Sequence, residues 1–278
     1  MRAYVVNLPA SVDQVLHERR RDHIESELGR TGIPYRFVDS VDGLRLTPEE
    51  RAELVDEEAV AASPHWLTDG VLGASLSHIA AYRAILEEGE PAGLVLEDDA
   101  VLPDNLATLL DAIAGQLSGA EVVLLYWRSV REPVVFSTAD SVKLMNGAML
   151  RYPRELQTLG CASAYVVTAE ACRRMVDVLL PIRSCTDTWV TFNEWGAFDS
   201  LRCVVPHAAG NRTDFKSTVN YHGDSSLRAS LSSFVAHRRV FPLHQLFGMI
   251  RAARERRGSR FELSPERSRF ADSASHQG

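Results

Sequence analysis

Short apolar runs alternate with amphipathic stretches along the first 180 residues. The run 3–8 is rich in strand-forming residues and is stopped by Pro9, so it predicts a buried strand. Ser11 and Gln14 then form a capping-box pair, which predicts the start of a helix. Apolar residues continue at roughly helical spacing until Gly32, where the helix is expected to end.

The same alternation continues toward the middle of the chain. A second strand is predicted at 35–38, and Thr47 with Glu50 forms a capping box that opens a polar helix. A helix is expected over 73–88 because its leucines and isoleucines fall on one face. The apolar strand 93–96 has no polar interruption, which predicts burial on both faces, as in a parallel sheet.

Four later segments extend this order. Apolar spacing predicts a helix over 103–117, a strand at 122–126, another strand at 164–167 and a helix over 168–180. The segment 129–160 is irregular, and we expect hairpins or loops there that shape an acceptor site. Strands and helices that alternate in this way predict an α/β fold with an open, Rossmann-type sheet flanked by helices.

Composition limits the organisation and the partners of the chain. At 278 residues and 45% hydrophobic, the chain is long enough for one large core, predicted over 1–236. The formal net charge of −7 argues against nucleic acid as a partner. Arginines concentrate in the predicted extension 237–278, which reads as a helix with a solvated basic face and a disordered tail. The alternative is peripheral contact of these arginines with anionic lipid or a glycolipid acceptor.

The cysteines and the N-terminus bear on location. The four cysteines show no metal-binding spacing, and reduced thiols are the simplest interpretation. No apolar run reaches the roughly 18 residues of a membrane-spanning helix, and no leader-like pattern precedes the first strand. We therefore expect a cytoplasmic protein that begins at Met1, with the inner membrane face as the alternative location.

Three carboxylates, Glu97, Asp98 and Asp99, follow directly on the strand 93–96. Ligands of open α/β sheets bind beyond the carboxyl ends of the strands. In an extended chain Glu97 and Asp99 point to one side and Asp98 to the other, so one acid could meet a ribose while another holds Mn²⁺ or Mg²⁺ against a diphosphate. The alternative interpretation is an acidic turn that only solvates the strand end.

Several short motifs follow one another in an order that resembles glycosyltransferase family 25, which includes bacterial lipooligosaccharide galactosyltransferases and collagen galactosyltransferases. Each motif is weak alone, and their joint order over residues 3–215 makes the resemblance specific. The matching segments are Val6-Asn7-Leu8, Val41-Asp42-Gly43, Gly73-Ala74-Ser75-Leu76-Ser77-His78, Leu96-Glu97-Asp98-Asp99 and Ser163-Ala164-Tyr165.

The resemblance implies a GT-A-like fold, a UDP-sugar donor carrying galactose or glucose, and transfer to an acceptor hydroxyl with inversion. It also implies that Asn7 and Asp42 lie at strand ends that hold uridine, and that Glu97 and Asp99 bind the metal. The donor-binding residues implied are Asn7, Leu8, Asp42, His78, Glu97 and Asp98. Two departures affect the acceptor: Gly73-Ala74 replaces the usual Gly-Cys, and the family's Gln-x-x-x-Ser-Asp-like stretch appears only as Asn211-Arg212-Thr213-Asp214.

His78 has two interpretations. On a helix it lies with Ser75 and Tyr82, away from the main apolar face, so it could reach the donor pocket. A histidine that is hydrogen-bonded structurally to a neighbouring loop is equally compatible with the pattern.

An inverting transfer needs a base that takes the acceptor proton, and Asp187 is the candidate. The alternative role is an N-cap for a helix over 188–195, and Glu194 and Asp214 are the next candidate bases. Two other functions remain open from the sequence. One is a metal-dependent nucleotidyltransferase, and the other is an inactive nucleotide-sugar binder.

Overall fold

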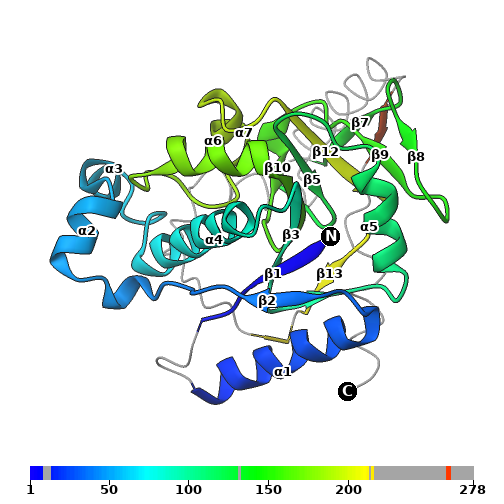
Figure 1. Cartoon of the computed structure of the whole chain (residues 1–278). Helices are drawn as coiled ribbons and strands as arrows, with labels where there is room; N and C mark the ends of the chain where they lie inside the picture. Colours follow the sequence, from blue (N-terminus) through cyan, green and yellow to red (C-terminus); the bar gives the residue numbers. More distant parts are fainter. Residues whose placement is uncertain (9–13, 131–132, 213, 216–260, 264–278) are drawn as a thin grey trace, which may run out of the picture.

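The computed structural model describes residues 1–8, 14–130, 133–212, 214–215 and 261–263. Its centre is an eight-stranded mixed sheet in the order β2-β1-β3-β11-β5-β12-β9-β8 (Figure 1). The strands of this sheet are β1 (Arg2–Val6), β2 (Tyr35–Phe37), β3 (Ala92–Glu97), β5 (Glu121–Leu124), β8 (Val142–Lys143), β9 (Met149–Arg151), β11 (Ala164–Thr168) and β12 (Ser200–Val205). The α/β fold with an open sheet flanked by helices is confirmed.

Helices cover both faces of the sheet (Figure 1). Helices α4 (Asp69–Glu87) and α6 (Ala169–Leu179) share one buried apolar cluster with one face, and α1 (Gln14–Thr31) and α5 (Leu106–Ala114) share a second cluster with the other. The smaller helices are η1 (Gly43–Arg45), α2 (Pro48–Leu54), α3 (Glu57–Ala62), η2 (Leu156–Thr158) and α7 (Trp189–Glu194). The side chains of β3 therefore alternate between the α4 face and the α1 face.

Strand β3 is buried on both faces, as expected, but its neighbours differ in direction. It runs parallel to β1 and antiparallel to β11. The expectation of a parallel sheet around this strand is wrong. The chain returns to β11 from β5 without a crossover helix, and a parallel neighbour would need such a crossover. Burial of β3 comes from the helices on either face and does not depend on strand direction.

Two of the three predicted helix caps lie in the described residues. Helix α2 has the predicted capping box between Thr47 and Glu50. Helix α7 has Thr188 as its N-cap residue, so the N-cap alternative for Asp187 is wrong. In the first capping pair, Ser11 lies outside the described residues, and α1 begins at Gln14.

The segment after β5 forms short strands, as predicted. They include β6 (Arg128–Ser129), β7 (Val135–Ser137) and β10 (Leu159–Gly160). Two further two-residue strands, β4 (Ala100–Val101) and β13 (Gly210–Asn211), pair with each other beside the end of β3. Within the predicted extension 237–278, residues Phe261–Leu263 form β14 against β7, and the remainder lies outside the described residues.

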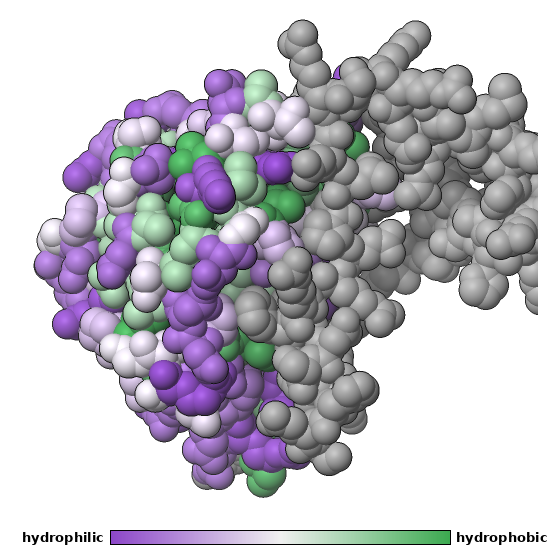
Figure 2. Space-filling model, turned by 90° about the vertical axis from the view of Figure 1, so that its right-hand side faces the viewer, coloured by the Kyte–Doolittle hydropathy of each residue, from purple (hydrophilic) through white to green (hydrophobic). Residues whose placement is uncertain are grey.

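The visible surface in Figure 2 is mostly hydrophilic, with smaller apolar areas between the polar residues. None of the described helices is both long enough and apolar enough to cross a bilayer.

Candidate functional site

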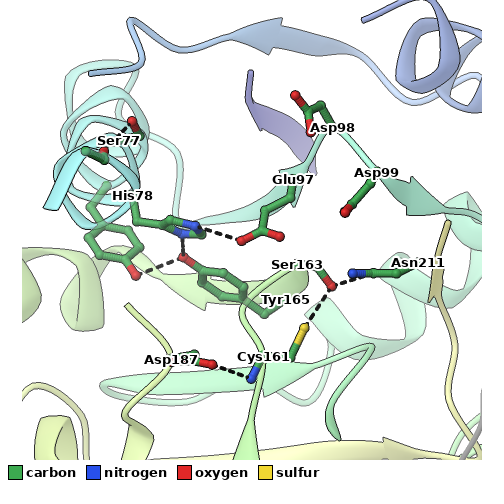
Figure 3. Close-up of polar contacts among 12 residues, drawn as sticks. Ser77, His78, Glu97, Asp98, Asp99, Cys161, Ser163, Tyr165, Asp187 and Asn211 are labelled. Atoms are coloured by element: carbon green, nitrogen blue, oxygen red, sulfur yellow. Dashed lines mark hydrogen bonds and ion pairs between the residues drawn. The ribbon is translucent and has the colours of Figure 1, made fainter. Parts of the chain in front are cut away.

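The acidic cluster lies where three strands meet at one edge of the sheet. Asn7 follows β1, Glu97 ends β3, and Ser163 precedes β11, whose antiparallel direction brings its beginning to this edge. The backbone N–H of Glu97 donates to the Ser163 carbonyl at 2.8 Å. In Figure 3 the side chains of Glu97 and Asp99 point the same way and Asp98 points the opposite way, as alternation predicted.

A buried arginine from α1 neutralises part of this cluster. Arg20 donates to Asp98 Oδ1 at 2.6 Å and to Asp99 Oδ2 at 3.0 Å. Asn7 donates from Nδ2 to the other oxygen of Asp98 at 2.7 Å. The Arg20 and Asp98 side chains are only 6% and 7% exposed, whereas Glu97 is 32% exposed. Asp98 is therefore fixed by the protein itself, and Glu97 is the acid of the cluster most open to a ligand.

Asp99 has a different environment from Asp98. Burial, together with the negative charge of Glu97, raises the pKa of Asp99 to about 7, although Arg20 acts in the opposite direction. Its Oδ1 atom is buried and has no hydrogen-bond partner. A buried carboxylate oxygen without a partner is costly unless a ligand satisfies it. Asp99 is thus a position where a bound cation would satisfy a buried oxygen that has no hydrogen-bond partner.

Glu97 is linked to the core through a histidine on α4. The Nε2 atom of His78 lies 3.5 Å from Glu97 Oε1, and Nδ1 lies 2.7 Å from the Tyr165 hydroxyl. That hydroxyl is 2.8 Å from the hydroxyl of Tyr82 (Figure 3 draws the chain). His78 is only 2% exposed, so the structure places it behind Glu97.

The peptide on the other side of the site has an unusual conformation. Cys161 has φ of +79°, which is strained for a residue with a side chain. Its N–H donates to Asp187 Oδ2 at 2.9 Å, and its carbonyl accepts from Trp189 Nε1 at 3.2 Å. The Cys161 thiol donates to Ser163 Oγ, which donates to Asn211 Oδ1 at 2.7 Å. Asp187 thus lies beside Cys161, where one of its oxygens accepts from the strained backbone (Figure 3).

Asp42 lies in a loop that packs on α4, five residues after the end of β2. The expectation that it sits at a strand end is therefore wrong, because residues 38–41 separate it from β2 and Asp42 is itself the N-cap residue of η1. Its carboxylate accepts from Leu44 N at 3.0 Å. The loop is fixed by the Val41 N–H, which donates to Ser77 Oγ at 2.8 Å. Leu8, the last residue described before the gap, continues directly from Asn7.

The remaining candidate bases lie in other settings. Glu194 is exposed at the end of α7. Asp214 pairs with Arg212, and the hydrogen bonds from that guanidinium lower the pKa of Asp214.

The described residues contain no group of three or more His, Cys, Asp or Glu side chains that could hold a metal ion. Mg²⁺ and similar cations at diphosphate sites use only one or two carboxylates, with phosphate oxygens and water as the other ligands. The unsatisfied Asp99 Oδ1 and the open Glu97 carboxylate fit that smaller requirement.

Two arginines of this site were missing from the sequence prediction. Arg20 had a signal, because it lies four and eight residues before Ile24 and Leu28, and so on the buried stripe of α1. Arg128 on β6 is exposed, donates to the Tyr126 hydroxyl, and lies close enough to Asp99 for their charges to interact. No spacing in the sequence indicates that Arg128 lies near Asp99.

A Haemophilus influenzae protein provisionally named a glycosyltransferase is 28% identical over 208 residues, which are 72% of this chain and 66% of that protein. The lacto-N-neotetraose biosynthesis glycosyltransferase LgtB of Neisseria meningitidis is 34% identical over 112 residues, 40% of this chain and 37% of LgtB. The chain thus matches less than two thirds of the length of either relative.

A solved structure from Bacillus anthracis, provisionally named a glucose-1-phosphate thymidylyltransferase, aligns with 84% of this chain and 94% of its own at 10% identity. Its TM-score of 0.39 is too low to support an argument about fold or function. The family comparison is decisive, because the profile of glycosyltransferase family 25, described as an LPS biosynthesis protein, matches residues 1–190. With more than half of its length covered by that profile, this chain belongs to glycosyltransferase family 25.

Proposed function

We propose that this protein transfers a hexose, galactose or glucose, from a UDP-sugar to a hydroxyl of a glycan or glycolipid of the lipopolysaccharide type, with inversion at the anomeric carbon. Family membership supports the sugar transfer. The observation that carries the site assignment is the pairing of an unsatisfied, buried Asp99 oxygen with the open carboxylate of Glu97 at the edge of the sheet.

Glu97 and Asp99 would hold a Mn²⁺ or Mg²⁺ ion. Such an ion, when bound, supplies Lewis-acid stabilisation of the charge that develops on the leaving diphosphate. Asp98 is held by Asn7 and Arg20, and we assign it to the support of the donor-binding edge.

We assign the nucleotide to the edge formed by Asn7, Leu8 and the Asp42 loop. The exposed guanidinium of Arg128 lies close enough to Asp99 to interact with its charge, and it could pair with a phosphate oxygen. Asn7 and Leu8 follow β1, Asp42 precedes η1 and Arg128 lies on β6, so donor binding would require the folded sheet edge.

Asp187 is the proposed base. One of its oxygens accepts from Cys161 N, and a carboxylate has further acceptor positions for the proton of an attacking hydroxyl. Trp189 is buried beside it and donates its indole N–H to the Cys161 carbonyl. We therefore assign recognition of the acceptor sugar to residues around Asp187, and removal of the acceptor proton to Asp187 itself.

Incubation of the full chain with UDP-galactose or UDP-glucose tests the proposal, with MnCl₂ in one arm and EDTA in the other. We expect UDP release that needs the metal and rises with a glycan acceptor. Asp99→Ala should abolish this release while the protein keeps its circular dichroism spectrum. Undiminished release by Asp99→Ala would refute the assigned role. Pyrophosphate release from a sugar phosphate and UTP would indicate a nucleotidyltransferase, and donor binding without turnover would indicate an inactive binder.

A further inference from the structure

Three hydroxyl and ring groups form a buried chain that ends at Glu97. The Tyr82 and Tyr165 hydroxyls lie 2.8 Å apart, the Tyr165 hydroxyl lies 2.7 Å from His78 Nδ1, and His78 Nε2 faces Glu97 at 3.5 Å. Tyr82 and Tyr165 are fully buried. From Tyr82 on α4 the chain reaches Tyr165 on β11, and Figure 3 shows how it returns to His78 on α4 and faces Glu97.

The geometry gives this chain a direction. His78 Nε2 is buried and has no hydrogen-bond partner, and Glu97 is the acceptor it faces. A neutral imidazole that donates from Nε2 must accept at Nδ1, and among the described residues the Tyr165 hydroxyl is placed to donate there. The Tyr165 oxygen can then accept from Tyr82. In this order Tyr82 donates to Tyr165 and Tyr165 donates to His78, which leaves the Nε2–H of His78 directed at Glu97.

We propose that Tyr82, Tyr165 and His78 form a positioning relay that fixes the Nε2–H tautomer of His78 and thereby orients the Glu97 carboxylate toward the donor. The inference rests on the proposed function of Glu97. Outer groups that orient a ligand-binding side chain commonly change affinity or activity by 10–100-fold when they are lost. His78, Tyr165 and Tyr82 are positioning residues in this view, since none of them has to touch the substrate.

The sheet register supplies a matched control. Tyr4 on β1 and Tyr165 on β11 both pair with Val95 of β3, so the two tyrosines stand on the same face from opposite sides. Both are fully buried. The Tyr4 hydroxyl donates to Glu88 at 2.9 Å, beyond the end of α4 and away from the acidic edge. Tyr4→Phe and Tyr165→Phe therefore remove the same group from equivalent positions, and only one of them belongs to the relay.

The kinetic test compares these variants in the full chain. Tyr165→Phe should lower kcat for UDP-sugar turnover by roughly 10–100-fold with little change in the acceptor KM, and Tyr82→Phe should lower it less. Tyr4→Phe should have the kcat of the wild type. Its melting temperature should be similar to that of Tyr165→Phe. Equal kcat values for Tyr4→Phe and Tyr165→Phe would overturn the relay.

A second comparison separates positioning from packing. His78→Gln keeps an N–H donor that can reach Glu97 but has no ring nitrogen for Tyr165, whereas His78→Leu has neither. We expect His78→Gln to retain more activity than His78→Leu, and Tyr165→Phe to have little further effect in the His78→Gln background. Full additivity of the two changes would contradict the proposal.

A third readout does not depend on activity, so it separates failure of the relay from failure of the proposed function. In protein labelled with ¹⁵N-histidine, the His78 signals can be assigned by their loss in His78→Gln. We expect the Nε2–H tautomer in the wild type and in Tyr4→Phe, and a mixture of tautomers in Tyr165→Phe. The Nδ1–H tautomer or a doubly protonated ring in the wild type would overturn the relay, whatever the enzyme assay shows.

Discussion

Arg20 donates a hydrogen bond of 2.6 Å to Asp98, although 78 residues separate them in the chain. The same guanidinium bonds Asp99, and both partners come from a turn that would otherwise place three negative charges at one strand end. The positive charge that the acidic cluster requires is therefore partly internal. A ligand cation would have to compensate only the remaining charge of Glu97 and Asp99.

Arg20→Met is expected to destabilise the protein by about 3–5 kcal/mol at pH 8, because it leaves buried carboxylates without a partner. The loss should be smaller at pH 5, where Asp98 and Asp99 can take up protons. Urea unfolding at both pH values measures this. Arg21→Met is the control, since Arg21 pairs with Glu25 on the exposed side of α1 and should cost about 1 kcal/mol or less. Equal losses for the two variants would contradict the assignment.

Asp99→Asn should change how stability depends on pH. The folded pKa of Asp99 is about 7, above its ordinary value of 3.8, so folding favours the protonated form. That contribution is complete below pH 4 and is lost as the pH rises through 7. In EDTA, the free energy of unfolding of the wild type should therefore fall between pH 5 and 8. The curve for Asp99→Asn should be flatter, and the variant should be more stable than the wild type at pH 8. Asp199→Asn, an exposed carboxylate paired with Arg174, should leave the wild-type curve unchanged.

Asp187→Asn distinguishes the two roles of this residue. The amide oxygen can still accept from Cys161 N, but the amide cannot take a proton. If Asp187 is the base, kcat should fall by about 10²–10⁴-fold while the melting temperature stays the same. Asp187→Ala should lose both activity and stability, since it also releases the strained peptide. An Asp187→Asn variant with wild-type kcat would leave only the structural role.

Gly43→Ala should weaken donor binding. A Cβ at this position would lie 1.8 Å from the Asp69 carbonyl oxygen, so the loop that carries Asp42 would have to move away from α4. Calorimetric titration with UDP should show the loss of affinity. Gly29→Ala is the matched control, because nothing lies within 4 Å of its Cβ and alanine favours the helix by up to about 1 kcal/mol. Unchanged UDP binding by Gly43→Ala would exclude the Asp42 loop from the donor site.

Arg128→Met should raise the Kd for UDP by about tenfold, the effect of losing one charge-assisted hydrogen bond. Arg173→Met on α6 removes another exposed guanidinium, which pairs with Glu170 one turn away, and its Kd for UDP should match the wild type. Equal affinities for the two variants would remove Arg128 from the phosphate site.

The local pattern of the sequence predicted most of the elements near the site. Strand β3, helix α4 and the capping box of α2 follow from residues close together in the chain, and each lies near its expected position. The antiparallel insertion of β11 could not be predicted in this way, because the pairing of Tyr165 with Val95 depends on the path of a long irregular segment.

Side-chain partners were harder to predict than elements. Three consecutive arginines occur at 19–21, and only the phase of α1 decides that Arg20 turns inward. The alternation of Glu97 and Asp98 was predictable from the strand, but their partners on α1 and α4 come from distant parts of the chain. The local sequence pattern could therefore not predict the contact of His78 with Glu97.

The direction of β11 has a consequence for how substrate preference can change in this lineage. Because β5 and β11 are antiparallel neighbours, the excursion from 125 to 163 leaves and re-enters the sheet at the edge that holds the acidic cluster. Insertions or deletions in the parts of that excursion outside β8 and β9 would remodel this edge without shifting the register of the eight-stranded sheet. New acceptors could thus be accommodated by changes in those segments, while Asn7, Glu97 and Asp99, which lie outside the excursion, keep their positions.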